Sequence, residues 1–542
     1  MKYLIKYFLL ISFYTLHLYS NAQTIEEKWH ICLSGSEWDE GKGLIQANDT
    51  YWAVGHTESN DGNISYNHGA WDIWLVNVDN AGNLITEKTF GGSNLDGGYV
   101  DIKKLNDTIF YIVARSKSSD GDISFNPWPG PLGNYWVIQI NNLGEIIWEK
   151  VLGGSGKEQM RDAAITDDGG IIVLGVSTSD DGDISNNYGD FDMWMVKLNQ
   201  DGVKQWDMSL GGTGFEGGGS IKQTSDGGYI IVGATDGVGG GNFDTTTNHH
   251  SIHYMDTWVV KLDSLRNIEW QQCYGGYYHD GGANILEIDD GYIVLSSTNS
   301  NDGDVSGFHG IAGNGATGND IWVIKINLVG DIIWQNCLGG SYNDFARNIF
   351  TTSDDGYMIV GSTGSKDGDV VGYNGVTTGI YEDVWMAKLT DDGELTWQYC
   401  YGGGGREDIY RGVIQKSDYN YVMTIGTDTD EWQCNGQMWP SLRVFELGDS
   451  TTGMPIIKQG EVVAVYPNPV SSELIIDYSQ LNNNSITTIE VFDSYGRQIY
   501  STKVSKGTQQ TTINVVGWTK GLYIVRIMDL GKVVGRRKII VD

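Results

Sequence analysis

The sequence predicts an all-β chain built from repeats, and three observations support this. A skeleton recurs in which an Asp precedes a Trp by two residues, and a Gly-containing turn, a second Trp and a Gly-Gly pair follow. The chain holds 19 Trp and 30 Tyr, which suit pleated strands. The repeat is regular, since the first Trp recurs every 58 to 64 residues, at Trp74, Trp136, Trp194, Trp258, Trp322 and Trp385. Such self-similarity indicates a repeat architecture.

Each repeat contains four strand-like segments. In the sixth repeat we expect strands over 346–352, 357–363, 384–389 and 395–401. Asp-Gly turns separate the first two and the last two strands, because Gly supplies the positive φ that a tight hairpin needs. A long loop separates the second strand from the third. Four short antiparallel strands per repeat are typical of a β-propeller blade.

The count of repeats predicts seven blades. The Gly-Gly link, or a degenerate form of it, marks seven starts, at Gly35, Gly91, Gly153, Gly211, Gly275, Gly339 and Gly402. The last repeat lacks its fourth strand, and the segment 29–33 at the other end of the chain has the sequence of one. We therefore expect a seven-bladed propeller in which the N-terminal strand closes the last blade and removes the exposed edges. An open solenoid is the alternative, but it does not explain these complementary ends.

Four of the five cysteines occupy one repeated position, three residues after a Trp: Cys32, Cys273, Cys337 and Cys400. Equivalent positions in different blades lie farther apart than a disulfide can span. We therefore expect small buried side chains there, and a leftover thiol at Cys434.

Composition changes along the chain indicate four parts. A basic start, a short apolar core and small residues before Gln23 predict a signal peptide over 1–22. The propeller is expected over 23–448, a polar linker over 449–461 and a small β-sandwich over 462–542. No later stretch is apolar enough to span a membrane. The net charge of −34 argues against nucleic acid as a partner.

The last part carries specific motifs. It opens with Val465-Tyr466-Pro467-Asn468-Pro469, continues with a segment ending at Gly496-Arg497 and a segment from Gly521 through Tyr523, and ends near Lys538. These motifs and their C-terminal placement resemble the type A C-terminal sorting domain of the type IX secretion system of Bacteroidetes. The resemblance implies that the secretion machinery is a partner, that the domain is cleaved, and that the protein is released or attached to the outer-membrane surface. The repeats also resemble secreted Gly/Trp-rich proteins, some labelled endoglucanases, without offering a catalytic motif.

The expected functional face holds the long loops, because loops on a rigid scaffold carry function. Four of these loops contain Asp-Gly-Asp, a pattern that clusters oxygen ligands for Ca²⁺ on a tight turn. The candidate metal ligands are Asp120, Asp122, Asp181, Asp183, Asp302, Asp304, Asp367 and Asp369. The EF-hand Glu is missing, so a simple Asx turn remains the alternative.

A second acidic pattern follows each Gly-Gly link by four positions, from Asp39 to Glu407. A carboxylate in every repeat favours a turn-capping role over a cation site at the channel mouth. No nucleophile elbow, phosphate loop or HExxH motif is present. We therefore expect a secreted binding or adhesion module for a glycan or a protein, with a secreted glycoside hydrolase as the alternative. The catalytic residues of such a hydrolase cannot be selected from 69 acidic residues.

Overall fold

The computed structural model describes residues 25–244, 254–310, 318–375, 381–417, 419–428, 440–449, 464–466, 470–477, 486–493, 497–503, 510–529 and 532–541. All regular elements in these ranges are β-strands. The chain divides into two compact units, Met1–Asp449 and Ser450–Asp542. The predicted signal peptide and nearly all of the predicted linker lie outside the described residues.

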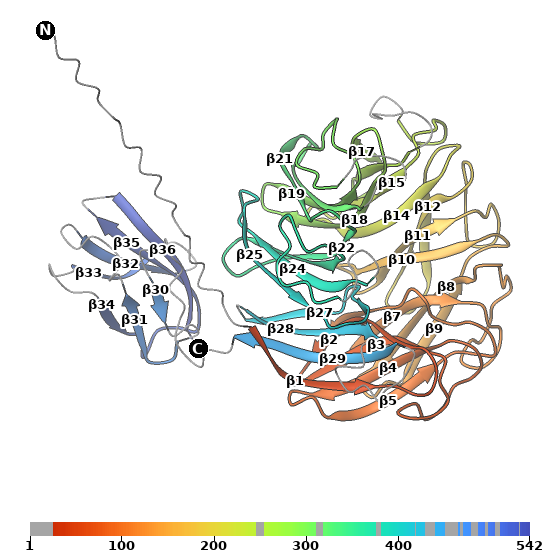
Figure 1. Cartoon of the computed structure of the whole chain (residues 1–542), viewed down its shortest axis with the longest axis horizontal. Coiled ribbons are helices and arrows are strands. Elements are labelled where there is room, and N and C mark those ends of the chain that lie inside the picture. Colours follow the sequence, from red (N-terminus) through yellow and green to blue (C-terminus); the bar gives the residue numbers. More distant parts are fainter. Residues whose placement is uncertain are drawn as a thin grey trace, which may run out of the picture. The chain divides into compact units, whose positions relative to one another are not determined.

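Six sheets of the first unit each contain four antiparallel strands in chain order (Figure 1). The first strands are β2 (Asp39–Ala47), β6 (Asp101–Asn106), β10 (Glu158–Ile165), β14 (Glu216–Gln223), β18 (Asp280–Ile288) and β22 (Asp344–Thr351). The second strands are β3 (Thr50–Thr57), β7 (Ile109–Ser116), β11 (Ile171–Ser177), β15 (Tyr229–Thr235), β19 (Gly291–Thr298) and β23 (Tyr357–Thr363). The third strands are β4 (Asp72–Asp79), β8 (Asn134–Asn141), β12 (Asp192–Leu198), β16 (Asp256–Leu262), β20 (Asp320–Asn327) and β24 (Asp383–Leu389). The fourth strands are β5 (Leu84–Phe90), β9 (Ile146–Leu152), β13 (Lys204–Leu210), β17 (Ile268–Tyr274), β21 (Ile332–Leu338) and β25 (Leu395–Tyr401). These sheets have the form of propeller blades.

A further sheet combines both ends of this unit. It consists of β1 (Ile25–Leu33), β29 (Ser441–Asp449), β28 (Asn420–Thr427), β26 (Glu407–Asp408) and β27 (Val413–Ser417). Strand β1 pairs antiparallel with β29, with Trp29 opposite Glu446 and Leu33 opposite Leu442.

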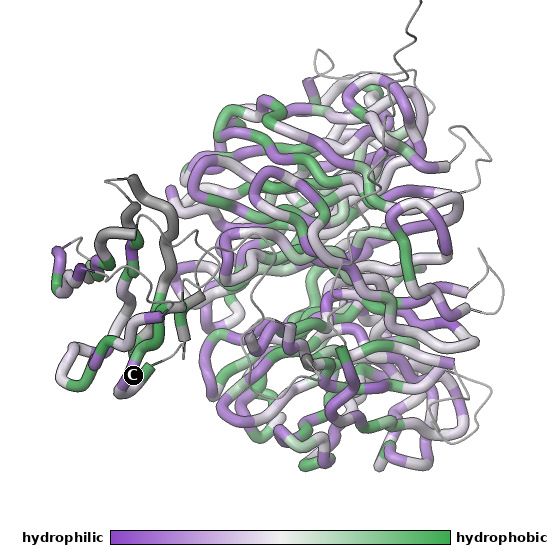
Figure 2. The backbone as a smooth tube through the Cα atoms, turned by 60° about the vertical axis from the view of Figure 1, so that its left-hand side comes forward, coloured by the Kyte–Doolittle hydropathy of each residue, from purple (hydrophilic) through white to green (hydrophobic). Residues whose placement is uncertain are grey.

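The hydrophobic cores lie between sheets, and each core draws residues from two neighbouring sheets. The core between the fifth and sixth sheets, for example, contains Ile293 and Val323 from one and Ile359 and Trp385 from the other. The second and third strands are buried through their middle, as in the all-buried patterns of β23 and β24, whereas fourth strands such as β9 are partly exposed. Hydrophilic residues gather in the connecting turns and loops (Figure 2).

The repeated Trp explains the spacing of the repeat. All six first Trp side chains are completely buried. Each indole Nε1 donates a hydrogen bond to the side chain thirteen residues later, on the adjacent fourth strand; Trp322, for example, reaches Gln335 Oε1 at 2.8 Å. The other acceptors are Glu87, Glu149, Asp207, Gln271 and Gln398. A buried indole keeps its apolar area out of water and still satisfies its one donor.

The cysteine prediction is wrong at one position. Cys273, Cys337 and Cys400 are free and buried, as expected, but Cys32 is disulfide-bonded. The distance argument covered only pairs among the four equivalent positions, so it did not exclude a bond from Cys32 to a cysteine outside that set. Cys434 lies outside the described residues.

The described residues of the second unit form two sheets. One is formed by β30 (Ala464–Tyr466), β31 (Glu473–Asp477) and β34 (Gln510–Asn514), and the other by β33 (Gln498–Lys503), β32 (Ile486–Asp493), β35 (Gly521–Asp529) and β36 (Lys532–Val541). Leu474 and Ile513 of the first sheet share one core with Val491 and Val525 of the second. A single core between two antiparallel sheets is a sandwich arrangement.

Candidate functional site

The eight candidate metal ligands lie in the long loops between second and third strands. The first Asp of each Asp-Gly-Asp accepts a backbone N–H from the residue after the Gly-Gly link, in the pairs Asp120–Ser93 (2.8 Å), Asp181–Ser155 (2.8 Å), Asp302–Tyr277 (2.7 Å) and Asp367–Ser341 (2.8 Å). The second Asp accepts the N–H of the first link glycine, in the pairs Asp122–Gly91 (3.1 Å), Asp183–Gly153 (3.2 Å), Asp304–Gly275 (3.3 Å) and Asp369–Gly339 (3.3 Å). These carboxylates fasten each long loop to the link that begins the same sheet.

The carboxylates four residues after each link are buried caps. Asp344 accepts hydrogen bonds from Gly340 N (2.8 Å), Ser365 Oγ (2.9 Å) and Thr363 Oγ1. The same buried position is held by Asp39, Asp96, Glu158, Glu216, Asp280 and Glu407. Capping of the turn, the interpretation that the sequence favoured, is therefore what these groups do.

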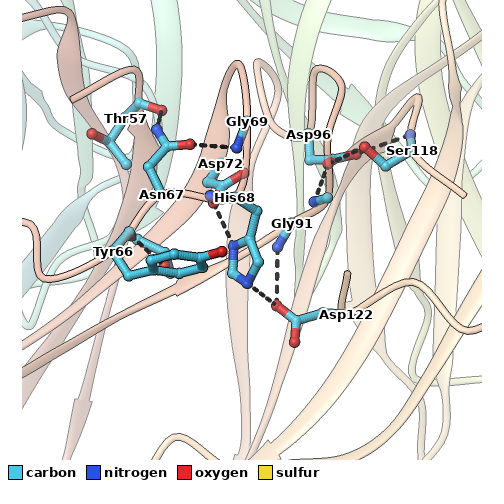
Figure 3. A network of polar contacts seen from close by, with 12 residues as sticks. Thr57, Tyr66, Asn67, His68, Gly69, Asp72, Gly91, Asp96, Ser118 and Asp122 are labelled. Carbon is cyan, nitrogen blue, oxygen red and sulfur yellow. Dashed lines mark hydrogen bonds and ion pairs between the residues drawn. The ribbon is translucent and has the colours of Figure 1, made fainter. Parts of the chain in front are cut away.

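An Asp two residues before the buried Trp anchors the other end of the long loop by accepting a backbone N–H from it, at Asp72, Asp192, Asp320 and Asp383. Asn134 holds this position before Trp136. Asp72 accepts a hydrogen bond from His68 N at 2.7 Å, and His68 Nδ1 lies 2.6 Å from the same oxygen (Figure 3). His68 Nε2 lies 3.5 Å from Asp122, so this histidine joins two carboxylates of neighbouring sheets. His309 repeats the arrangement between Asp320 and Asp369.

Two buried carboxyl groups from neighbouring sheets meet at each of several link glycines. A Cβ added to Gly339 would lie 2.6 Å from Asp344 Oδ2 and 2.9 Å from Asp320 Oδ1, so only glycine fits there. Burial raises the pKa of Glu216 to about 8, those of Asp280 and Asp344 to about 7, and those of Asp192 and Asp383 to about 6. Two carboxylates at one dry site cannot both ionise cheaply, so these junctions hold protons near neutral pH.

Within the described residues, no group of three or more His, Cys, Asp or Glu side chains has the geometry to hold a metal ion. The Asp-Gly-Asp carboxylates are engaged by backbone donors, which accounts for the pattern without a metal. Ca²⁺ binding at these loops stays a prediction.

A cavity of about 390 Å³ lies at the inner strands, near their beginnings, which is the end of each sheet where the link glycines lie. Every sheet contributes to its lining, and in each sheet the residue three positions after the capping carboxylate is among the lining residues. In chain order these residues are Lys42, Tyr99, Arg161, Gly219, Ala283, Arg347 and Tyr410. The backbone places them alike, because the ladder register shifts at this residue in the sheets that begin with β2, β10, β14, β18 and β22. A bulge of this kind re-aims a side chain.

A buried ionic network lies beside the cavity and includes the lining residue Arg411. Asp162, which is fully buried, lies 3.4 Å from Lys103 Nζ and 3.2 Å from Lys222 Nζ and also pairs with Arg411. Arg411 additionally donates to Gly219 O at 3.1 Å. Burial lowers the pKa of Lys222 to about 7, and Lys103 beside it acts in the same direction.

Aromatic rings hold the other cations. Lys42 Nζ lies 3.4 Å from the centre of the Tyr410 ring, and the Arg347 guanidinium lies 5.1 Å from the same ring. The Arg161 guanidinium lies 4.3 Å from the centre of the Tyr99 ring. These distances are typical of cation–π contacts, and the contacts hold three cationic side chains around the cavity.

Sequence reasoning missed this cavity although the signal was present. The capping carboxylates were recognised in every repeat, and counting three residues onward from each one yields the seven lining side chains. The capping position is acidic in all seven sheets, whereas the lining position varies from Gly to Arg.

The second unit has a sequence match. Residues 464–542 match the secretion system C-terminal sorting domain family. This confirms the resemblance drawn from the motifs, and it implies a secreted or cell-surface protein that interacts with the type IX secretion machinery. No membrane-crossing helix was found in the part of the chain that the structure describes.

The predicted sorting residues are only partly described. Tyr523 lies in β35, is buried and donates from its hydroxyl to Thr519 O at 2.6 Å. Gly521 begins the same strand with φ +149°, while Tyr466 and Lys538 lie in β30 and β36. Pro467, Asn468, Pro469 and Gly496 lie outside the described residues.

No curated protein matches the chain. Solved structures with some likeness include BBS1N in complex with ARL6DN (9% identity, TM-score 0.40, covering 80% of this chain and 99% of that one). They also include a duf4221 family member from Bacteroides vulgatus (10%, 0.33, 79% and 98%) and the polysaccharide lyase Uly1 (7%, 0.38, 77% and 90%). At these TM-scores none of them carries an argument about this chain.

Proposed function

We propose that the chain is a secreted seven-bladed propeller that acts as a binding module on, or released from, the cell surface, and that its central cavity is the ligand site. The sorting domain supports export, and attachment to the outer-membrane surface is part of the proposal. The main support for this proposal is that the seven lining residues differ from sheet to sheet, whereas the backbone and the capping carboxylates around them repeat. A scaffold role predicts the same residue in each sheet, and a ligand site does not.

Two contacts support a closed ring of seven blades. The sheet containing β1 shares one hydrophobic core with the sixth sheet and another with the first. Trp29 of β1 also packs against Gly82 in the turn between β4 and β5. Trp148 and Trp334 pack in the same way against Gly202 and Gly393 of the sheet that follows theirs. Trp29 therefore occupies the place of a fourth-strand Trp.

The lowered pKa of Asp101, the carboxylate that lines the cavity, favours binding over glycoside hydrolysis. A general acid needs a raised pKa. Burial would raise the pKa of Asp101, but Lys103 at 2.7 Å and Arg411 outweigh it and hold this pKa below its usual value. A group in this state is a poor proton donor at neutral pH.

The test applies the full chain to an array of immobilised glycans and cell-surface proteins, together with an Ala283→Trp variant that fills the cavity. We expect every specific ligand of the parent protein to lose binding to the variant. Unchanged binding by the variant would overturn the cavity as the site. New reducing ends released from any soluble polysaccharide would make hydrolysis the primary function.

A further inference from the structure

The cavity has the opposite charge from the protein around it. The chain carries a net charge of −34. Four cationic side chains line the cavity, Lys42, Arg161, Arg347 and Arg411, against a single carboxylate, Asp101. A cluster of cations in a low-dielectric recess is costly to assemble and attracts anions.

Two of these cations have donors to spare. Lys42 and Arg411 are engaged, since Lys42 lies 2.6 Å from Glu40 and Arg411 pairs with Asp162. Arg161 donates to Gln159 Oε1 at 3.0 Å, and the carboxylate paired with Arg347, that of Asp408, is 3.7 Å away. The buried Nε of Arg161 and that of Arg347 have no hydrogen-bond partner among the described residues. A guanidinium with unsatisfied donors suits a planar, bidentate anion such as a carboxylate.

The wall beside these cations is made of small residues. Gly218, Gly219, Gly282 and Ala283 line one side of the cavity and leave it open, while Tyr99 retains 38% of its surface exposed. The volume is within the range of small-molecule sites. A flat wall, an accessible aromatic edge and cations on two sides suit a pyranose ring that carries a carboxylate better than they suit an extended peptide, which needs backbone partners.

We propose that the cavity binds a short acidic glycan through its uronate carboxylates, with Arg161 and Arg347 as the carboxylate ligands and the sugar ring against the glycine wall. This inference rests on the proposed binding function and specifies its ligand class. A short oligomer or a chain end is preferred to a long polyanion, because the acidic surface around the cavity repels charge that stays outside it.

The experiment is calorimetric titration of the full chain with trigalacturonate and with its fully methyl-esterified form, which has the same rings without charge. We expect the acid to bind at least about tenfold more tightly than the ester. The Arg161→Gln/Arg347→Gln double variant should bind the acid roughly 10- to 100-fold more weakly, as for loss of charged hydrogen bonds. The Lys150→Gln/Lys503→Gln double variant makes a matched charge change on the exposed strand positions of β9 and β33 and should leave binding unchanged. Equal unfolding midpoints of all variants establish that the double variant is folded.

Each other outcome overturns the inference in a recognisable way. Equal affinity for acid and ester would show that the carboxylate is not recognised, while the cavity would remain a binding site. Binding of inorganic phosphate or sulfate with the same variant dependence indicates a bare anion site. Binding of oligoglutamate in place of trigalacturonate indicates an acidic peptide. If none of these probes binds, the acidic-glycan assignment is overturned. The proposed function is then decided by the Ala283→Trp comparison alone.

Discussion

The junctions between sheets and the central cavity use charged residues in opposite ways. At the junctions, carboxyl groups recur in sheet after sheet, are buried, and accept hydrogen bonds from links and loops of the scaffold. In the cavity, the aligned position holds Lys, Tyr, Arg, Gly, Ala, Arg and Tyr in turn. Positions that keep the same residue type in every sheet therefore stabilise the sheets, whereas positions whose residue type varies are available for ligand binding. The predictions below test this division through stability.

The largest expected effect of a single substitution belongs to the repeated Trp. Trp322→Ala removes a completely buried ring and leaves Gln335 without its donor, so we expect a loss of about 3–5 kcal/mol in the free energy of unfolding. Urea unfolding followed by Trp fluorescence measures it. Trp128→Ala is the control, because Trp128 is 41% exposed and its loss should change stability by less than about 0.5 kcal/mol. Equal effects at the two positions would contradict the scaffold role.

The protonated junctions predict an unusual pH dependence. The folded-state pKa values of Glu216, Asp280 and Asp344 lie above those of the unfolded chain, so the folded state retains protons that the unfolded state releases. Stability should therefore be highest near pH 5 and fall as the pH rises to 8, by about 3 kcal/mol for each group with a pKa shift of this size. Thermal unfolding in EDTA at both pH values measures this change.

A single substitution tests the origin of that pH dependence. Glu216→Gln removes one titrating group while keeping one oxygen that can accept from Gly212 N and an amide N–H that can donate to Thr235 Oγ1. The variant should lose less stability between pH 5 and 8 than the parent. A melting temperature that rises with pH in the parent would show that the junctions do not hold protons.

The sequence predicts the scaffold well because the scaffold is local. The predicted strands 357–363 and 395–401 coincide with β23 and β25, and turn chemistry such as Asp392-Gly393 sets their ends. The cavity was not predicted because its residues lie tens of residues apart and share only a backbone position. Lys42 and Tyr410 touch in space, but nothing in either local sequence indicates the other. The bond of Cys32 was missed for a related reason, since only equivalent positions were compared.

Calcium should have a smaller effect. If the Asp-Gly-Asp loops bind Ca²⁺ with the millimolar to submillimolar affinity of extracellular modules, 1 mM Ca²⁺ stabilises the fold by about 1 kcal/mol. The gain should be similar at pH 5 and pH 8, because hydrogen bonds lower the pKa values of Asp120 and Asp367 and keep both carboxylates ionised over this range. Thermal unfolding with Ca²⁺, with Mg²⁺ and with EGTA measures it.

Two single variants, Asp367→Asn and Asp369→Asn, are the control for calcium. Each keeps a hydrogen-bond acceptor, for Ser341 N and for Gly339 N respectively. The variants should lose the calcium response at that loop while folding normally. No shift in the parent at 5 mM Ca²⁺ would leave the Asp-Gly-Asp pattern as a turn motif alone.

The smallest expected effect on stability lies in the cavity. Arg347→Gln should change the free energy of unfolding by less than about 1 kcal/mol, because its nearest paired carboxylate is 3.7 Å away and the contact it loses is the cation–π contact with Tyr410. Arg411→Gln, in the same cavity, should cost about 1–3 kcal/mol, because Arg411 pairs with the fully buried Asp162 and satisfies Gly219 O. Urea unfolding of both variants separates a cation held for the fold from one left available to a ligand. A loss at Arg347 as large as that at Arg411 would place both in the scaffold and erase the distinction between cavity and junction.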